Sequence, residues 1–302
     1  MSKRAGFVAL IGEPNAGKST LLNRMVGADV AIVTHKVQTT RTRIRGIAIE
    51  GNAQIVLVDT PGLFQPRRRL DRAMVTAAWG GAADADIVVL LVEAHRGRTS
   101  GMTAILDSLR HGSGRAPVAL AINKIDRVKR TALLLLAEEL NGTFPFARSF
   151  MVSARNGDGV DDLRHWLAEE LPEGPWLYPE DQIADMPLRM IAAEITRKAL
   201  TLRLHQELPY QLTVETESWD TSPDGSVRID QVIYVMRDGH KGIVLGKNGE
   251  MIKVVGQLAR REITEFMDCK VHLFLTVKVR SNWQDDAERF REMGLEFPDG
   301  AP

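Results

Sequence analysis

The first part of the chain alternates short apolar runs with stretches whose apolar residues recur at helical spacing. The apolar runs predict strands over residues 6–12, 44–51, 53–60, 86–94, 117–124 and 146–154. The helical patterns cover residues 18–27, 101–112, 132–140 and 159–171. Apolar runs of this length, separated by helices, are typical of a buried parallel sheet. We therefore expect an α/β domain with a mostly parallel sheet and helices on both faces.

A change of pattern near residue 175 divides the chain into two domains. Residues 175–187 are rich in proline and acidic residues and have no period, which is typical of a linker. After the linker, the pattern predicts a long helix over residues 188–208 and strands over 210–220 and 227–237. Two helices follow, the second ending at residue 266, and the last element is a strand over 270–280. We therefore predict an α/β domain over residues 1–174, a linker over 175–187, and an α+β domain over 188–302 that ends in a C-terminal tail.

Composition narrows the class of protein without naming a partner. The 302 residues are 44% hydrophobic and 26% charged, which is typical of globular domains. The 39 basic and 39 acidic residues cancel, so any surface for a polyanion must be local. A single cysteine, Cys269, excludes an internal disulfide framework and fits a reducing cytosol. The N-terminus lacks the apolar core of a signal peptide, and the leucine-rich run 132–140 is too short to span a bilayer, so we expect a cytoplasmic protein.

A phosphate-binding loop follows the first predicted strand. Residues 12–19 match the pattern G-x-x-x-x-G-K-[ST] between a strand and a helix, which is the context that this loop requires. The glycines allow backbone N–H groups to face phosphate oxygens, and the helix N-terminus adds partial positive charge. Lys18 is placed to reach the outer phosphates, and Ser19 to bind Mg²⁺. The expected nucleotide contacts are Gly12, Glu13, Pro14, Asn15, Ala16, Gly17, Lys18, Ser19 and Thr20.

Two further loops predict that the base of the nucleotide is guanine. The segment NKID at 123–126 follows a strand, at the carboxyl end where ligands bind in such sheets. A carboxylate at Asp126 can accept hydrogen bonds from N1–H and the exocyclic amine of guanine, whereas adenine offers no such donor pair. We expect Asn123 to tie this loop to the phosphate-binding loop, and Ser153-Ala154 to offer a backbone N–H to the guanine oxygen. The expected contacts in these loops are Asn123, Lys124, Asp126, Ser153 and Ala154.

A third group of residues is expected to bind Mg²⁺ and to sense the terminal phosphate. The segment Asp59, Thr60, Pro61, Gly62 follows a strand, with Asp59 placed to hold the metal through water and Gly62 to contact the phosphate by its N–H. The segment QTTR at 38–41 supplies a threonine to the metal shell, and we favour Thr40 over Thr39. The expected metal ligands are therefore Ser19, Thr40 and Asp59.

A second glycine loop, GKNG at residues 246–249, joins two predicted helices of the α+β domain. It lacks the four-residue spacer and the Lys-Ser/Thr pair of a nucleotide-binding loop, and it matches the GxxG loop of a KH domain, which clamps the backbone of single-stranded nucleic acid. The element order is that of a type II KH domain. Between residues 240 and 262, five basic residues oppose two acidic ones, a local charge of +3. The expected RNA contacts are Lys241, Ile243, Gly246, Lys247, Asn248, Gly249, Lys253 and Arg260, with Val244, Ile252 and Val255 completing an apolar wall for the bases.

The nucleotide-binding segments resemble those of the translation-factor-like small GTPases and occur in the same order. Leu63 follows DTPG where many such GTPases carry a glutamine that orients water, so slow hydrolysis is implied. Asn15 matches an asparagine that helps to bind K⁺ in potassium-activated relatives, so the resemblance implies K⁺ beside Mg²⁺. We expect catalysis to depend on Lys18, Thr40, Asn15 and Gly62.

The combination with a type II KH domain resembles the Era family of bacterial ribosome-assembly GTPases over nearly the whole chain. The supporting stretches are GEPNAGKST, QTTR, DTPGL, NKID, SA, YPEDQIADMPLR, ELPY and LGKNGEMIK. The resemblance implies binding of GTP and GDP, of small-subunit ribosomal RNA near its 3′ end and of the 30S subunit, with a role in subunit assembly and no DNA partner. It also implies peripheral association with the inner membrane.

Three functional interpretations are compatible with the sequence. The first is a switch, in which GTP orders residues 28–42 and 60–72 and thereby changes the access of RNA to the KH groove. The second is a constitutive RNA-binding scaffold with a structural nucleotide, against which the complete set of nucleotide motifs argues. The third is a related GTPase of tRNA modification or large-subunit assembly, against which the KH half argues.

Overall fold

The chain forms two compact units, one made of Met1–Asp185 with Phe290–Pro302 and the other of Met186–Arg289. The computed structural model describes residues 2–33, 44–64, 66, 69–111, 116–204, 208–281, 286, 290 and 295–297. Among the helices in these ranges, none is both long and apolar enough to cross a membrane.

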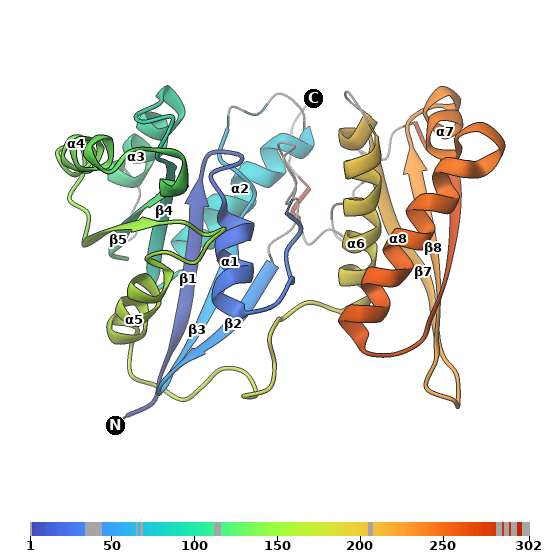
Figure 1. Cartoon of the computed structure of the whole chain (residues 1–302), viewed down its shortest axis with the longest axis horizontal. Coiled ribbons are helices and arrows are strands. Elements are labelled where there is room, and N and C mark those ends of the chain that lie inside the picture. Colours follow the sequence, from blue (N-terminus) through green and yellow to red (C-terminus); the bar gives the residue numbers. More distant parts are fainter. Residues whose placement is uncertain are drawn as a thin grey trace. The chain divides into compact units, whose positions relative to one another are not determined.

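Within the described residues, a six-stranded sheet forms the centre of the first unit (Figure 1). Its strands are β1 (Arg4–Gly12), β2 (Ile44–Glu50), β3 (Ala53–Asp59), β4 (Ile87–Glu93), β5 (Val118–Asn123) and β6 (Arg148–Val152), in the order β2-β3-β1-β4-β5-β6. All neighbouring pairs are parallel except β2 and β3, which form a hairpin around Gly51-Asn52. The predicted, mostly parallel sheet is confirmed, and the carboxyl ends of its parallel strands meet at one edge.

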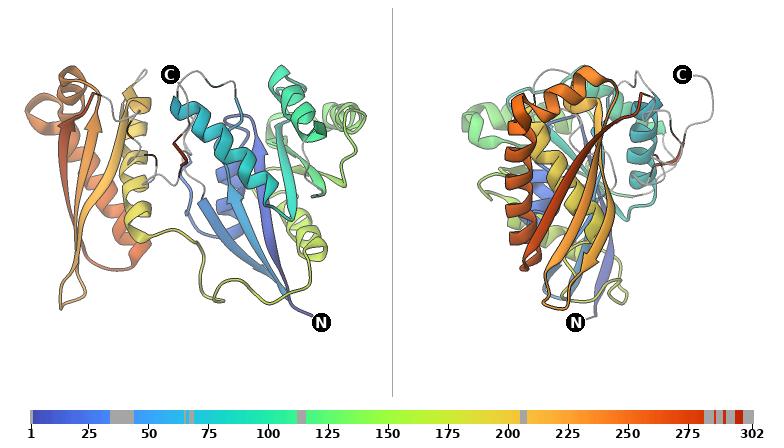
Figure 2. Two further views of the ribbon diagram at one scale, coloured as in Figure 1. Left: turned by 180° about the vertical axis from the view of Figure 1, so that it is seen from behind. Right: turned by 90° about the vertical axis from the view of Figure 1, so that its right-hand side faces the viewer.

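Helices cover both faces of this sheet. On one face, α1 (Lys18–Val26) and α5 (Val160–Glu170) contact each other and strand β3. On the other, α2 (Arg69–Ala83), α3 (Ser100–His111) and α4 (Arg130–Asn141) share a core cluster with β1, β4 and β5. Figure 1 shows α1 in front of the sheet, and the reverse view in Figure 2 brings α2 to the front.

Helix α2 is an element that the sequence pattern did not predict. Its buried stripe consists mainly of small residues, including Ala73, Ala77, Ala78 and Gly81. Alanine and glycine contribute little to an amphipathic signal, so the helical period is weak in the sequence even though the helix packs on β1.

The segment predicted as a linker is held along the edge of the first sheet. The Ile47 N–H donates to the carbonyl of Ile183 at 2.9 Å, and the Asp185 N–H donates to the carbonyl of Arg45 at 3.0 Å. The Asp185 carboxylate also pairs with the Arg45 guanidinium at 2.9 Å and accepts a hydrogen bond from the Tyr178 hydroxyl at 2.7 Å. These contacts cover part of the β2 edge, which would otherwise present unpaired backbone groups.

The second unit has the α+β order that the sequence predicts. Its elements are α6 (Leu188–Arg203), β7 (Leu212–Thr221), β8 (Val227–Val235), α7 (Asp238–Leu245), α8 (Glu250–Met267) and β9 (Val271–Val279). In the described residues the sheet has the order β7-β8-β9, with β7 antiparallel and β9 parallel to β8. Helices α6 and α8 contact each other and pack on β7 and β9 (Figure 2). Helix α6 ends at Arg203, five residues before the predicted end.

Phe290 and residues 295–297 belong to the first unit, whereas the sequence predicts that they end the second domain. Phe290 is fully buried, and its ring meets that of Phe297 edge-on at a centroid distance of 5.0 Å. The Arg69 guanidinium, at the start of α2, lies 5.0 Å from the Phe297 ring centroid. This cation–π contact joins the segment to α2 of the first unit.

Candidate nucleotide-binding and RNA-binding sites

The loop between β1 and α1 has the geometry of a phosphate cradle. The buried amine of Lys18 donates to the carbonyls of Gly12 and Glu13, each at 3.0 Å, so its side chain lies across the loop. Gly17 has a φ of 100°, and a Cβ there would collide with the side-chain amide of Asn123. Glycine is therefore required at this position by both the backbone conformation and the close approach of the neighbouring loop.

The electrostatics of Lys18 suit an anionic ligand. Burial lowers the pKa of Lys18 to about 8, although the carboxylates of Asp59, Glu13 and Glu93 favour its charged form. Phosphate oxygens within reach of the amine would favour the charged form further, because opposite charge offsets desolvation.

Two of the three expected metal ligands are neighbours. The Ser19 hydroxyl donates to the Asp59 carboxylate at 2.6 Å, and Asp59 is fully buried at the end of β3. A hydroxyl and a carboxylate at the mouth of a phosphate cradle are the hard oxygen ligands that Mg²⁺ prefers. The third expected ligand, Thr40, and its alternative Thr39 lie outside the described residues.

The segment after β3 packs against the phosphate-binding loop. The Thr60 hydroxyl donates to the carbonyl of Leu10 at 2.7 Å, which leaves it turned toward β1. A Cβ on Gly62 would lie 2.9 Å from the Cα of Pro14, so glycine allows the two loops to touch.

Asn123 joins three loops at the carboxyl edge of the sheet. Its amide donates to the carbonyl of Ala16 at 2.8 Å, as the sequence analysis expected. Its side-chain oxygen accepts from the N–H groups of Lys124 at 2.8 Å and Ala154 at 3.0 Å. The fully buried Ser153 hydroxyl donates to one oxygen of Asp126 at 2.8 Å, which orients that carboxylate.

The role expected for Ala154 needs adjustment. Its N–H donates to Asn123, and the Ser153 N–H donates to the carbonyl of Asp158 at 2.9 Å. A guanine oxygen at this loop would therefore share the Ala154 donor with the Asn123 side chain. Bifurcated sharing of one N–H is common in proteins.

A cavity of about 720 Å³ brings these loops together, within the range of small-molecule sites. Eleven of the predicted contacts line it: Pro14, Asn15, Gly17, Lys18, Ser19, Thr20, Gly62, Asn123, Lys124, Asp126 and Ala154. The lining also contains residues outside the sequence motifs, namely Ile32, Val33, Glu93, Arg96, Arg127 and Arg155.

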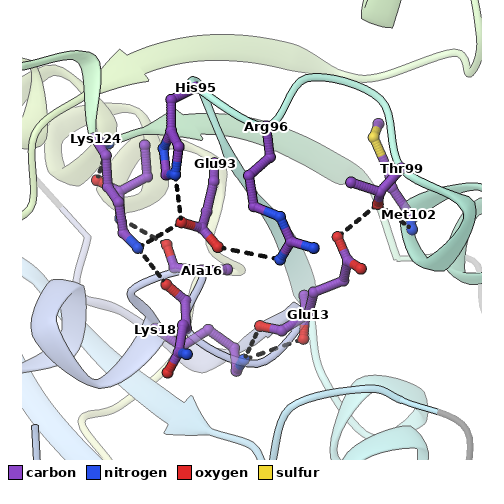
Figure 3. A network of polar contacts seen from close by, with 12 residues as sticks. Glu13, Ala16, Lys18, Glu93, His95, Arg96, Thr99, Met102 and Lys124 are labelled. Atoms are coloured by element: carbon purple, nitrogen blue, oxygen red, sulfur yellow. Dashed lines mark hydrogen bonds and ion pairs between the residues drawn. The ribbon is translucent and has the colours of Figure 1, made fainter. Parts of the chain in front are cut away.

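The side chain of Glu13 points away from the phosphate cradle (Figure 3). Its carboxylate accepts a hydrogen bond from the Thr99 hydroxyl at 2.6 Å, and that hydroxyl accepts from the N–H of Met102 at the start of α3. A carboxylate is favourable at a helix N-terminus and unfavourable beside phosphates. Glu13 can thus contribute its backbone to the cradle while its charge is held by α3.

Arg24 supports the base-binding loop and was not predicted. From the last turn of α1, its guanidinium donates to the carbonyl of Ala154 at 3.2 Å and also to that of Arg155. The contact joins residues that are far apart in the sequence, so no local pattern could have indicated it.

The GKNG loop of the second unit has the conformation that a backbone clamp requires. Gly246 and Gly249 have φ values of 73° and 77°, and Asn248 has a φ of 52°. The side chains of Lys247 and Asn248 are exposed. Lys253 and Arg260 are also exposed and, seven residues apart on α8, share a helix face. Within the loop itself, exposed Lys247 places positive charge beside glycine backbone.

The apolar wall predicted beside this loop is only partly correct. Ile243 is 55% exposed and Ile252 is half-buried, so both can contact a ligand. Val244 and Val255 have no exposed surface and belong to the core of the second unit, which excludes them from the wall. The sequence gives all four residues the same apolar character. Only the packing of α7 and α8 on the sheet shows that the two valines face the core and the two isoleucines do not.

Two family models and a close relative identify the chain. A model described as a 50S ribosome-binding GTPase matches residues 7–124, and a KH domain model matches residues 207–284. The GTPase Era of Dinoroseobacter shibae is 72% identical over 298 residues, which are 98% of this chain and 97% of the relative. The chain belongs to the GTPase Era family.

Further Era proteins agree over the same length. The Era of Brucella melitensis is 61% identical over 295 residues, 98% of this chain and 94% of the relative. A crystal structure of Era with MgGDPNP and nucleotides 1506–1542 of 16S ribosomal RNA has a TM-score of 0.92 at 34% identity, over 97% of this chain and 99% of that one. An Aquifex aeolicus Era variant bound to GDP·AlF4⁻ has a TM-score of 0.91 at 34% identity, over 96% and 99% of the two chains. The expected combination of a GTPase domain with a KH domain is confirmed.

Proposed function

We propose that this Era-family GTPase is a nucleotide-dependent switch that binds small-subunit ribosomal RNA near its 3′ end through the KH domain and acts in assembly of the 30S subunit. The observation that carries the proposal is the presence, in one chain, of a cavity lined by the phosphate-binding loop and Asp126 and of a GKNG loop at 246–249 whose Lys247 and Asn248 are exposed. The solved Era complex with 16S ribosomal RNA supports the choice of RNA.

We also propose roles for the residues of the nucleotide site. The N–H groups of the 12–19 loop and Lys18 bind phosphates, and the Gly62 N–H senses the terminal one. Ser19, Asp59 and Thr40 hold Mg²⁺, which would neutralise charge that develops on the phosphate oxygens. The 2.6 Å contact between Ser19 and Asp59 supports this ligand pair.

A low intrinsic rate of hydrolysis is part of the proposal. Leu63 is 5% exposed, and its N–H donates to the carbonyl of Gly12 at 3.0 Å. Its side chain packs in the core beside α2, where it cannot orient an attacking water. The site therefore lacks at this position the group that would raise the rate.

Potassium is expected to stimulate hydrolysis through Asn15. This residue is exposed and lines the cavity. Its backbone carbonyl accepts a hydrogen bond from the Lys124 amine at 2.6 Å, and its side-chain oxygen can therefore bind a cation. A cation fixed beside the phosphates should raise the turnover number by about tenfold or more, as preorganised charge does. Phosphate release measured in KCl and in NaCl of equal ionic strength tests this.

The matched variant is Asn15→Gly, because glycine tolerates the φ of 66° at this position and lacks the side-chain amide. It should hydrolyse GTP at the same rate in both salts while it binds GDP as the parent does. Equal rates for the parent protein in the two salts would contradict a potassium site, and retained stimulation in the variant would place that site elsewhere.

RNA binding should depend on the bound nucleotide. We expect an oligoribonucleotide that covers the 3′ end of the small-subunit RNA to bind about tenfold more tightly with a non-hydrolysable GTP analogue than with GDP, which is an ordinary magnitude of coupling. Fluorescence anisotropy gives the two affinities, and crosslinking to cellular RNA identifies the sequence bound. Equal affinities would favour a constitutive scaffold, and crosslinks outside small-subunit RNA would contradict the proposed partner.

We further propose that the protein acts in the cytoplasm and associates peripherally with the inner membrane. The single cysteine supports a reducing compartment, and the resemblance to Era relatives is the source of the membrane expectation. Recovery of the protein in membrane and soluble fractions, before and after a high-salt wash, tests the second part.

A further inference from the structure

Glu93 is a buried carboxylate of the cavity that no nucleotide motif includes. It ends β4, directly beside Asn123 of β5 in the sheet register, and only 7% of its surface is exposed. Its carboxylate contacts the Lys124 amine at 2.6 Å, the Arg96 guanidinium at 3.5 Å and the His95 ring at 3.6 Å (Figure 3). A buried carboxylate of this kind requires such partners, because desolvation without them is costly.

Lys124 connects Glu93 to the phosphate-binding loop. The same amine that meets Glu93 also donates to the carbonyl of Asn15 at 2.6 Å. Lys124 and Asn15 have φ values of 65° and 66°, a left-handed backbone conformation that residues other than glycine rarely adopt. The amine is thus held between a carboxylate on β4 and a carbonyl of the loop, and it links two backbone positions that need support from their surroundings.

We propose that Glu93 is a positioning residue for nucleotide binding, which acts by holding Lys124 against the Asn15 carbonyl. A free lysine side chain samples many rotamers, and a nucleotide that ordered it would bind less tightly. Glu93 orders the side chain beforehand, so the cavity wall beside the base and the loop that cradles the phosphates are assembled before the nucleotide arrives.

The proposal predicts the direction in which the rate of nucleotide release changes when Glu93 is replaced. Because Glu93 lines a cavity for a polyanion, a purely electrostatic account predicts that loss of its charge weakens repulsion and slows release of the nucleotide. Positioning predicts the opposite, because Lys124 would lose its partner and release would become faster. The direction of the change therefore separates the two accounts.

The experiment measures dissociation of a fluorescent GDP analogue from Glu93→Ala, Glu93→Gln, Lys124→Ala and the double variant Glu93→Ala/Lys124→Ala. We expect Glu93→Ala to release GDP about tenfold faster, equivalent to about 1.4 kcal/mol, and Glu93→Gln to show a smaller increase of the same sign. In the Lys124→Ala background, removal of Glu93 should add little, because coupled residues are not additive. The KM for GTP should rise in Glu93→Ala, because the variant releases the nucleotide faster.

The control is Asp107→Asn, which breaks a carboxylate–arginine pair of 2.7 Å on α3 whose residues are not among the cavity lining. It should release GDP at the parent rate. Thermal unfolding without nucleotide reports whether each variant folds, and Glu93→Gln carries the test if Glu93→Ala does not. Unchanged or slower release in the Glu93 variants overturns the proposal, as does an equal acceleration by Glu93→Ala with and without Lys124.

Discussion

Replacement of Asp126 by asparagine should convert the guanine site into one that prefers xanthine nucleotides. One carboxylate oxygen is already oriented by the Ser153 hydroxyl at 2.8 Å, and the residue lines the cavity. Guanine would lose two hydrogen bonds to a charged acceptor, worth about 1.5–3 kcal/mol each, so GDP affinity should fall by about 10²–10⁴-fold. Xanthine carries an oxygen where guanine has its exocyclic amine, and the asparagine amide can donate to it. Calorimetric titration with GDP and XDP measures both changes.

Asp161→Asn provides the control for this substitution. It makes the same chemical change on α5, at a side chain that is 77% exposed and paired with Arg164 at 3.4 Å. Its affinity for both nucleotides should match that of the parent. Parental GDP affinity in Asp126→Asn would show that the base is read elsewhere, and loss of GDP without gain of XDP would point to a collapsed loop.

The nucleotide site could be predicted largely from the sequence because its parts are local. The motifs at 12–19, 59–62, 123–126 and 153–154 each directly follow an apolar strand, and parallel strands bring their carboxyl ends to one edge of the sheet. Gly12, Asp59 and Asn123 end β1, β3 and β5, so three separate segments converge without any information about distant contacts. The cavity that encloses eleven of the predicted residues is the result.

The residues that sequence analysis missed depend on contacts between distant segments. Glu93 ends an ordinary apolar strand, and only the pairing of β4 with β5 places it beside Lys124. Arg24 occupies an unremarkable helix position, and only the packing of α1 near the 153–155 loop gives it a role. The contacts that matter for the site, from Glu93 to Lys124 and from Arg24 to Ala154, join residues far apart in the sequence, so periodicity and local motifs carry no trace of them.

The linker and the apolar wall show a second limit of sequence patterns. Residues 175–187 lack a period because their order comes from individual contacts, such as the Arg45–Asp185 pair, and not from a repeating face. In the second unit, Ile243 and Val244 are adjacent and similarly apolar, yet Ile243 is 55% exposed and Val244 is fully buried. Hydrophobicity alone cannot say which of two apolar neighbours faces the core.

A negative charge placed in the GKNG loop should weaken RNA binding and leave the GTPase activity intact. The two glycines of the loop are not equivalent for this test. A Cβ on Gly246 would lie 2.6 Å from the Cβ of Met251, so a side chain there would distort the start of α8, whereas a Cβ on Gly249 meets nothing within 4 Å. In Gly249→Asp, a carboxylate close to RNA phosphates should weaken binding by about 1–3 kcal/mol, or about 5–150-fold. Anisotropy with an oligoribonucleotide of the small-subunit 3′ end, together with the basal rate of phosphate release, checks both parts.

Gly225→Asp is the matched control, because it makes the same substitution as Gly249→Asp at a different place in the second unit. Gly225 lies in the turn between β7 and β8 with a φ of 78°, against 77° at Gly249, and a Cβ there also meets nothing within 4 Å. The two variants therefore share the same backbone strain, the same added charge and the same open surroundings. If RNA binding falls in both alike, strain or net charge explains the loss. If it falls in neither, the loop does not touch RNA. Only a loss confined to Gly249→Asp locates the RNA backbone at the KH loop.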